Sequence, residues 1–209
     1  MSLGNSTLTK FLDDLASDLP APGGGSVAAL GASLAFALVS MVSNLTVGKE
    51  KYRGNWEKMK AAVETSEQLR IESLALMDDD VESFNAYMAA LKMPKETDDQ
   101  KSARASELEK TAKRAAEVPL SVLELCAKAA ELAVQAAEYG NPNTATDAGS
   151  AAVFAEATGK AAAYNVRINL PGIKDITFVT RARERMNNAL AEIARDCELA
   201  EAAMDRILK

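Results

Sequence analysis

Apolar positions along the chain recur every three to four residues, and the runs with this spacing are separated by clusters of proline and glycine. Side chains three and four positions apart lie on the same face of a helix, so this period predicts amphipathic helices. No run of residues shows the strict alternation that is typical of a half-buried strand. The pattern predicts six helices, over residues 7–18, 26–47, 55–92, 97–140, 145–168 and 174–209.

Prolines and polar residues refine the helix boundaries. Ser26 follows three glycines and is predicted to cap the second helix through its hydroxyl. Thr144 and Asp147 have the spacing of a capping box at the start of the fifth helix. Pro119 is expected either to kink the fourth helix or to split it. The fifth helix is expected to bury a stripe formed by Val153, Ala157, Ala161, Tyr164 and Ile168.

The order of these elements predicts a single domain over residues 1–209, with an all-α fold of the up-and-down bundle type. The longer helices would extend about 40 to 60 Å. A long, slender bundle leaves apolar surface uncovered, which favours a homodimer. Residues 26–43 carry no charge and are nearly long enough to cross a membrane. Because glycine, alanine and serine are frequent among them, we interpret them as a helix buried in the bundle or in a dimer interface, and we expect no membrane partner.

The composition narrows the classes of function. With 24 Lys and Arg against 30 Asp and Glu, the net charge of -6 argues against a nucleic-acid partner, since such proteins neutralise phosphates. The absence of histidine from the chain excludes Ser-His-Asp triads and histidine-ligated zinc, so proton chemistry must use carboxylates, lysine or tyrosine. Cys126 and Cys197 lack the spacing of a redox or metal motif, and we interpret them as reduced and buried. The acidic N-terminal segment is unlike a signal peptide, which favours the cytoplasm.

A run of three glycines lies directly before the start of the second predicted helix. Free backbone N–H groups and the helix dipole at such a place can hold an anionic or carbonyl oxygen, and Gly23, Gly24 and Gly25 carry no side chain to block it. Ser26 would add a hydroxyl to this candidate binding site. The alternative is a flexible hinge followed by a cap, because the run matches neither a Walker loop nor a dinucleotide-binding fingerprint.

Asp80 lies on the apolar stripe of the third predicted helix, three residues after Met77 and four before Phe84. A carboxylate that faces a core has either a partner or a raised pKa, and both conditions are common at catalytic sites. The alternative is a structural salt bridge to one of three cations that precede this helix, Lys49, Lys51 and Arg53.

Amides and charged side chains gather at the ends of the second and fifth predicted helices. The set consists of Asn44, Lys49, Asn143, Asp147, Asn165, Arg167 and Asn169. Capping accounts for part of it, since amides and lysine satisfy terminal carbonyls and a carboxylate stabilises a first turn. Together with Asp80, these residues form a candidate site of amides and carboxylates for which we expect no metal.

Five motifs follow one another along the chain: PAPGGGS at 20–26, NLTVGKEKY at 44–52, DDVESFNAYMAALKMPK at 79–95, GNPNTATDAG at 140–149 and NVRINL at 165–170. In these motifs the chain resembles the cyclodeaminase/cyclohydrolase family of folate one-carbon enzymes, nearly from end to end. One departure is Thr146, where the family usually has serine, but the hydroxyl is retained.

The resemblance implies a dimeric helical bundle that acts on a tetrahydrofolate derivative without a cofactor. It implies hydrolysis of 5,10-methenyltetrahydrofolate to 10-formyltetrahydrofolate. The alternative is a cyclodeaminase, which closes formimidoyltetrahydrofolate to the methenyl form and releases ammonia. The lack of a formiminotransferase domain favours the cyclohydrolase. A helical interaction protein that kept the fold without turnover is a third possibility.

The resemblance also suggests roles for individual side chains. Asp147 and Asp80 are expected to line one site, one acting as base toward water and both stabilising the cationic substrate. Lys49 would serve as an acid or bind a carboxylate. The N–H groups of the glycine run would contact the pterin or a glutamate carboxylate.

Overall fold

The structure is a computed structural model that describes residues 2–208. Within that range it contains six α-helices and no strand, which confirms the all-α fold. The helices are α1 (Leu8–Leu15), α2 (Gly24–Asn44), α3 (Trp56–Leu91), α4 (Asp98–Tyr139), α5 (Ala145–Asn169) and α6 (Ile176–Leu208). Short 3-10 helices lie in the connections of the described chain: η1 (Leu3–Asn5), η2 (Glu50–Asn55), η3 (Pro142–Thr144) and η4 (Leu170–Gly172).

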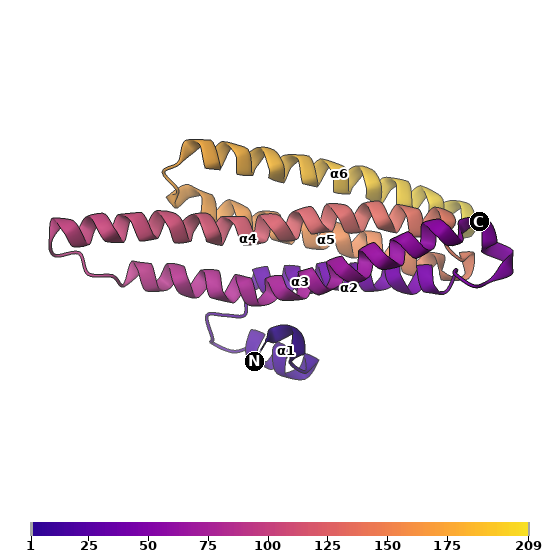
Figure 1. Ribbon diagram of the computed structural model, residues 1–209, viewed down its shortest axis with the longest axis horizontal. Coiled ribbons are helices and arrows are strands. Elements are labelled where there is room, and N and C mark those ends of the chain that lie inside the picture. Colours follow the sequence, from indigo (N-terminus) through magenta and orange to yellow (C-terminus); the bar gives the residue numbers. More distant parts are fainter. Residues whose placement is uncertain (1, 209) are drawn as a thin grey trace.

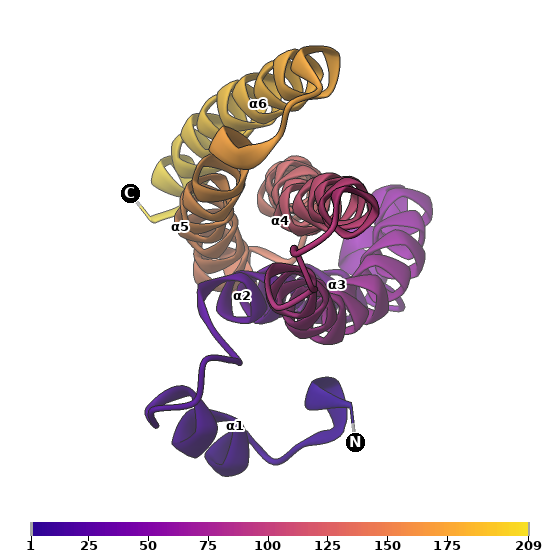
Figure 2. The ribbon, with the colours of Figure 1, turned by 90° about the vertical axis from the view of Figure 1, so that its left-hand side faces the viewer.

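The five long helices lie along one common axis and form an up-and-down bundle (Figure 1). In the end-on view, α4 lies among α2, α3, α5 and α6 and contacts all four (Figure 2). The short α1 lies outside the bundle, and Phe11 is its buried side chain. The chain between α1 and α2 therefore crosses the surface of the bundle before it enters the core.

The core helices approach one another closely because the side chains between them are small. A Cβ atom at Gly31 of α2 would lie 2.4 Å from Oγ1 of Thr158 on α5. A Cβ atom at Gly159 of α5 would lie 2.6 Å from Cδ1 of Ile193 on α6. Neither distance leaves room for a carbon atom, so glycine at these positions determines how near the helices pack.

Two contacts define the register between α2 and α5. Gly31 lies beside Thr158, and Gly24 lies beside Asn165. A step of seven residues toward the start of α2 is thus matched by seven residues toward the end of α5, so the two helices are antiparallel. The first turn of α2 lies beside the last turns of α5, and the end of α2 lies beside the start of α5.

The starts of α2 and α5 differ from the predictions. α2 begins at Gly24 with Gly23 as its N-cap, so Ser26 lies buried inside the first turn and does not cap the helix. The predicted capping box of α5 is also wrong, because the Thr144 hydroxyl donates to the carbonyl of Asn141 at 2.8 Å. In both places the hydroxyl that was predicted to cap the helix forms its hydrogen bond with a different group.

α4 continues through Pro119, so the helix is not split. Proline has no N–H to donate to the carbonyl four residues earlier, which here belongs to Ala115. The side-chain amide of Asn169 on α5 donates to that carbonyl at 2.8 Å. A side chain from the neighbouring helix therefore replaces the hydrogen bond that the proline removes.

Most of the stripe that was predicted to be buried on α5 faces outward, although Ala161 is partly buried against the core. Val153, Tyr164 and Ile168 are 54%, 67% and 76% exposed, while Ala148, Ala151, Ala155 and Ala162 on the opposite side are fully buried. The periodicity was correct, but the smallest side chains of α5 face the core and the largest face outward. The interior favours small residues because α5 is in close contact with α2, α4 and α6.

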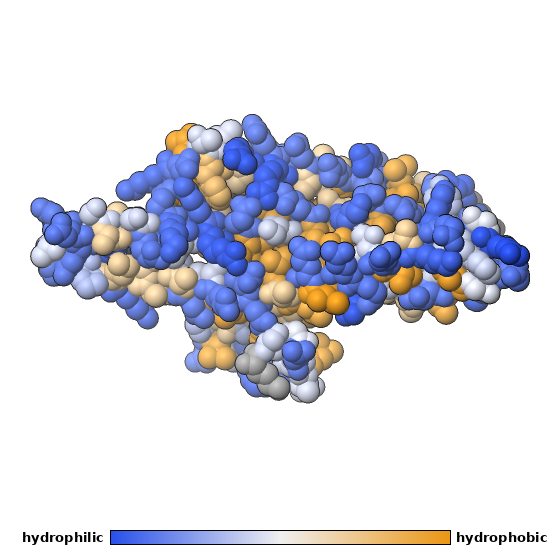
Figure 3. All heavy atoms as spheres, viewed as in Figure 1, coloured by the Kyte–Doolittle hydropathy of each residue, from blue (hydrophilic) through white to orange (hydrophobic). Residues whose placement is uncertain are grey.

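The exposed apolar side chains of α5 adjoin those of α2. Together they form a surface that we call the α2/α5 face, which comprises Val27, Leu34, Met41, Leu45, Val153, Phe154, Tyr164 and Ile168. Figure 2 shows α2 and α5 next to each other on one side of α4, with α3 beside α2. The side that carries α3 and α4 is largely hydrophilic (Figure 3).

α2 is long and apolar enough to cross a membrane by length and composition, with a mean hydropathy of 1.9. However, 61% of its most apolar window is buried inside the bundle, which agrees with the prediction of a core helix. Cys126 and Cys197 are free and buried, also as predicted. Burial raises the pKa of both thiols, that of Cys197 to about 11, so neither is a reactive thiolate at neutral pH.

Candidate functional site

A cavity of about 320 Å³ lies where the first turn of α2 meets the C-terminal third of α3 and the end of α5. The glycine run forms one wall, and Phe84, Tyr87 and Ile168 supply apolar surface. Asp80, Asn165 and Asn169 supply polar groups. We call this region, together with residues 20–26, the glycine-loop end.

Asp80 is the carboxylate of this cavity, and Ser26 holds it in place. The Ser26 hydroxyl donates to Oδ2 of Asp80 at 2.8 Å and lies 3.2 Å from the carbonyl oxygen of Met77. Burial raises the pKa of Asp80, while hydrogen bonds from the hydroxyl and the backbone N–H of Ser26 lower it in part. Asp80 is therefore a stronger base than an exposed carboxylate.

Gly25 is required for the position of Asp80. A Cβ atom at Gly25 would lie 2.0 Å from Oδ1 of Asp80, a separation that no side chain can occupy. The carboxylate thus lies against the bare backbone at the positive end of the α2 dipole. The salt bridges that were considered as an alternative are absent, because Lys49, Lys51 and Arg53 lie beyond the opposite end of α2.

Two amides of α5 line the cavity beside the glycine run. Asn165 lies against Gly24, and its Nδ2 donates to the carbonyl of Ala161 at 2.9 Å. Nδ2 of Asn169 donates to the carbonyls of Ala115 and Asn165 at 2.8 and 3.0 Å. Both N–H groups of Asn169 are thus engaged, and one of those of Asn165. Each side chain keeps its Oδ1 as an acceptor for a ligand.

The remaining candidates lie at the other end of α2. Asn44, Lys49 and Asn143 are exposed, and Asp147 is half-buried in the first turn of α5. We call this region, with the buried Asn141 that organises it, the Asn141 end. Arg167, by contrast, is exposed near the end of α5, beside the cavity.

Asn141 connects three segments at its end of the molecule. Its Oδ1 accepts from the Tyr52 hydroxyl at 3.0 Å and from the N–H of Asn143 at 3.1 Å. Its Nδ2 donates to the carbonyl of Leu45 at 3.3 Å, and its N–H donates to Oγ1 of Thr46 at 2.8 Å. These bonds hold the start of α5 against the end of α2. Neither Asn141 nor Tyr52 was predicted from the sequence as a functional residue. The Asn-Pro dipeptide at 141–142 is a turn signal, and it points to Asn141.

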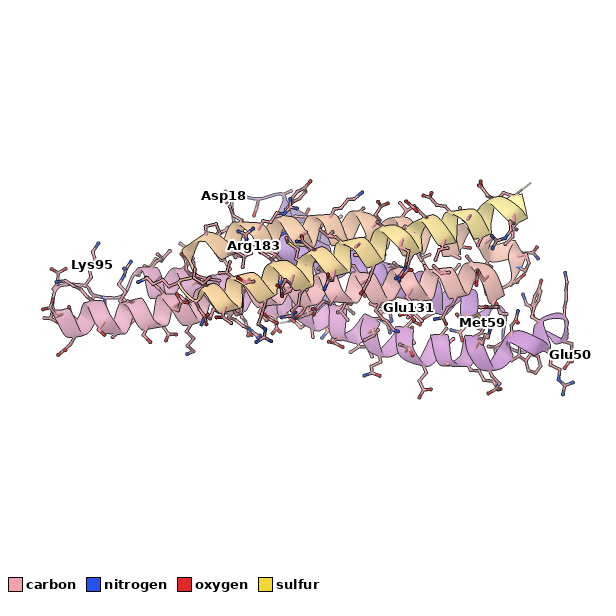
Figure 4. All side chains as sticks on the ribbon, turned by 90° about the horizontal axis from the view of Figure 1, so that it is seen from above. Asp18, Glu50, Met59, Lys95, Glu131 and Arg183 are labelled. Carbon is pink, nitrogen blue, oxygen red and sulfur yellow. The ribbon has the colours of Figure 1, made fainter. Side chains whose placement is uncertain are left out.

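The two carboxylates do not line one cavity within a single chain. Asn165 lies at the level of the glycine run, and Asp147 precedes it by 18 residues on the same helix. At a rise of 1.5 Å per residue, this separates the two ends by roughly 27 Å. In Figure 4, Asp18, which precedes the glycine run, and Glu50, which follows the end of α2, lie far apart along the bundle.

No group of three or more His, Cys, Asp or Glu side chains in the described chain is placed to hold a metal ion. The arrangement at the glycine-loop end instead offers a base, backbone N–H groups and amide acceptors. Such a set can position water against an electrophilic carbon and exchange protons with it.

Known proteins resemble this chain over most of its length. The model of the formiminotransferase-cyclodeaminase family matches residues 7–188. Methenyltetrahydrofolate cyclohydrolase from Methylorubrum extorquens is 43% identical over 189 residues, which cover 90% of this chain and 91% of that protein. Formimidoyltransferase-cyclodeaminase from Sus scrofa is 32% identical over 191 residues, which cover 91% of this chain but 35% of that longer protein.

The bundle itself also has a solved counterpart. The crystal structure of formiminotetrahydrofolate cyclodeaminase from Thermotoga maritima superposes with a TM-score of 0.89 at 31% sequence identity, and the match covers 98% of each chain. The chain therefore belongs to the formiminotransferase-cyclodeaminase family and is an enzyme of its cyclohydrolase/cyclodeaminase group.

Proposed function

We propose that the protein hydrolyses 5,10-methenyltetrahydrofolate to 10-formyltetrahydrofolate. The observation that carries this proposal is the placement of Asp80, a basic, partly desolvated carboxylate beside the bare first turn of α2. The match to the Methylorubrum cyclohydrolase, which spans nearly the full length of both chains, supports the same reaction.

The chemistry needs only groups that this cavity contains. Methenyltetrahydrofolate carries a cationic, amidinium-like carbon between N5 and N10. Water adds to that carbon as Asp80 accepts one of its protons. The bond from the carbon to N5 then breaks, N5 takes up one proton, and the second proton of the water is released. The negative charge of Asp80 also stabilises the bound cation, because the electrostatic attraction is strong in a desolvated cavity.

The walls of the cavity fit a flat, polar ring. Phe84, Tyr87 and Ile168 offer apolar surface for its faces, while the Oδ1 atoms of Asn165 and Asn169 can accept from its N–H groups. The N–H groups of the first turn of α2 suit a carbonyl oxygen or a carboxylate.

The protein also forms a homodimer in this proposal, through the α2/α5 face. Two helices of about 30 Å side by side present a surface of the order of 800 Å², which is what one partner contributes to a stable interface. A monomer would leave the large apolar side chains of this face in water. We place the dimer in the cytoplasm, since both thiols are buried and free and since its substrate is a folate.

The second candidate reaction is the cyclodeaminase reaction, and the similarity to the Thermotoga enzyme supports it. N10 would attack the formimidoyl carbon and ammonia would leave, with Asp80 again exchanging protons. A non-catalytic interaction protein is the third candidate.

Measurements of absorbance and of ammonia release distinguish these three candidate functions. We expect the purified protein to abolish the near-ultraviolet band of methenyltetrahydrofolate far faster than buffer does. A rate equal to that of buffer would contradict the hydrolase. Formimidoyltetrahydrofolate is then supplied and ammonia is measured. Ammonia release with no loss of the methenyl band would identify a cyclodeaminase, and no turnover of either substrate would favour the interaction protein.

A further inference from the structure

Pro119 lies buried in the middle of α4, where proline is the least favourable residue for a helix. It lacks the N–H that would donate to the carbonyl of Ala115, and its ring pushes that carbonyl away from the helix axis. Ala115 lines the cavity at the glycine-loop end. The one interruption that proline introduces into the backbone hydrogen bonds of α4 therefore lies at the wall of the site.

The freed carbonyl of Ala115 fixes the direction in which the Asn169 amide faces. Nδ2 of Asn169 donates to this carbonyl at 2.8 Å and to the carbonyl of Asn165 at 3.0 Å, so both of its hydrogens are engaged. If the amide turned around, Oδ1 would lie against two carbonyl oxygens with no proton between them. Within residues 2–208 no protein group donates to Oδ1 of Asn169, which is left as a fixed acceptor for a ligand.

An ordinary residue at position 119 would remove this constraint. Its N–H would donate to the carbonyl of Ala115 and draw the oxygen back toward the axis of α4. The bond from Asn169 to that carbonyl would weaken, and the amide could rotate. The orientation of the amide thus depends on a residue of the neighbouring helix that does not line the cavity.

The position of Asn169 matches one side of the ring in the proposed reaction. Asn165 lies beside Gly24, and Asn169 follows it by one turn, roughly 6 Å along α5. Because α2 and α5 are antiparallel, this turn leads away from Gly25, whose backbone touches Asp80. A pterin carries N5 and the one-carbon bridge on one side and its N3–H and 2-amino donors on the opposite side. A ring whose bridge carbon lies at Asp80 therefore extends its N–H donors toward Asn169.

From these contacts we infer that Pro119 is a positioning residue of the site. It frees the carbonyl of Ala115, and this carbonyl holds the Asn169 amide so that Oδ1 accepts from an N–H group of the pterin ring. The inference deepens the proposed function and rests on it, because both concern the same ring in the same cavity. The benefit is preorganisation, since the amide loses its rotational freedom when the chain folds and not when the ligand binds.

Binding of tetrahydrofolate tests this role without turnover, because tetrahydrofolate has the same N–H donors but no one-carbon bridge. Pro119→Ala should raise its dissociation constant about 10-fold, measured by anaerobic calorimetry, through the loss of one well-placed hydrogen bond. Val118→Ala is the matched control, since it trims a buried side chain of α4 by a similar volume and leaves the backbone hydrogen bonds unchanged. Its dissociation constant should stay within about twofold of the wild-type value.

Three results of this measurement would overturn the inference. They are an unchanged dissociation constant in Pro119→Ala, an equal loss of affinity in Val118→Ala, and no binding of tetrahydrofolate by the wild type.

Asn169→Ala shows whether Pro119 acts through the amide. Asn169→Ala alone should raise the dissociation constant about 10-fold, and the addition of Pro119→Ala should change it little further, because no amide remains to be positioned. In hydrolysis of methenyltetrahydrofolate, Pro119→Ala should raise KM by the same factor and leave kcat nearly unchanged, as expected for a contact made equally in the ground and transition states. A second loss of similar size in the double variant, or a lower kcat at unchanged KM, would contradict the inference.

Nuclear magnetic resonance of the free, isotope-labelled protein separates a failure of this inference from a failure of the proposed function. The side-chain NH₂ signals of Asn169 are identified by their absence from Asn169→Ala. Their exchange with water should be at least about 10-fold slower in the wild type than in Pro119→Ala, because a hydrogen-bonded donor is protected. Equal exchange would show that the amide is not held, and the inference would be wrong. If exchange and tetrahydrofolate binding change as expected while the wild type hydrolyses no methenyltetrahydrofolate, only the proposed reaction is wrong.

Discussion

The two ends of α2 both carry motif residues, but they are built differently. At the glycine-loop end, Asp80 fits against Gly25 inside a cavity, and burial changes its basicity. At the Asn141 end, Asp147 and Lys49 lie on the surface, and buried amide bonds of Asn141 fix the backbone that carries them. The difference fits the proposal that the first end holds the substrate. Four substitutions and one measurement of pH dependence would sharpen or break this comparison.

The largest effect is expected for Asp80→Asn. Loss of the base and of its charge should lower kcat for methenyltetrahydrofolate hydrolysis about 10²- to 10⁴-fold, while the isosteric side chain keeps the fold. Steady-state kinetics and circular dichroism measure the two quantities. Near wild-type kcat in a folded Asp80→Asn protein would remove Asp80 from the chemistry.

The second largest effect is expected for Gly25→Ala. The added Cβ would lie 2.0 Å from Oδ1 of Asp80, so the carboxylate must move. We expect at least a 10²-fold loss of kcat/KM, because small displacements of catalytic groups have effects of that size, and about 1–3 kcal/mol of destabilisation. Gly54→Ala is the matched control, since a Cβ there meets open space. Equal activity of the two variants would show that the fit against Gly25 is irrelevant.

At the opposite end, Asn141→Ala should lower the free energy of unfolding and leave the cavity at the glycine-loop end nearly unchanged. Removal of the amide leaves the Tyr52 hydroxyl and the Leu45 carbonyl without their partner, at a cost of about 2–4 kcal/mol in the free energy of unfolding. Urea denaturation measures this. Asn143→Ala is the control, because that side chain is exposed, and its change should stay within about 0.5 kcal/mol. Similar values for both variants would contradict the organising role of Asn141.

A smaller effect is expected where α5 meets Pro119. Asn169→Ala leaves the Ala115 carbonyl unpaired and should cost about 1–2 kcal/mol. In a Pro119→Ala background the restored N–H can serve that carbonyl, so the same substitution should cost about 1 kcal/mol less. A double-mutant cycle by urea denaturation measures the coupling. Strict additivity would show that Asn169 does not compensate for the proline.

The smallest effect is the dependence of stability on pH. Because burial raises the pKa of Asp80 above its usual 3.8, the folded protein binds this proton more tightly than the unfolded chain does. The resulting stabilisation is present below pH 3.8 and is lost as the pH rises through the raised pKa. Asp80→Asn cannot ionise, so its free energy of unfolding relative to wild type should increase from acidic to neutral pH. A difference that is constant with pH would exclude a raised pKa.

The sequence was sufficient for the class and number of helices, because proline and glycine clusters interrupt a clear helical period. It also identified Asp80 and the glycine run as separate candidates, and the family resemblance assigned them to one site. The sequence did not predict the features that depend on how the helices pack. On α5, alanines face the interior while Val153 and Tyr164 face outward. Periodicity alone does not show which face of a helix is buried. The distance between Asp80 and Asp147 depends on the antiparallel register of α2 and α5, which no local pattern contains.

The alanine-lined interior has a consequence for how this protein tolerates change. Truncation of a fully buried alanine removes a single methyl group, so at these positions the loss of side-chain volume does little damage. Almost every substitution at these alanines and at the buried glycines adds atoms and must push helices apart. Variation that preserves the fold is therefore expected to accumulate on outward positions, and a saturation mutagenesis map should show interior alanines and glycines as the least permissive sites.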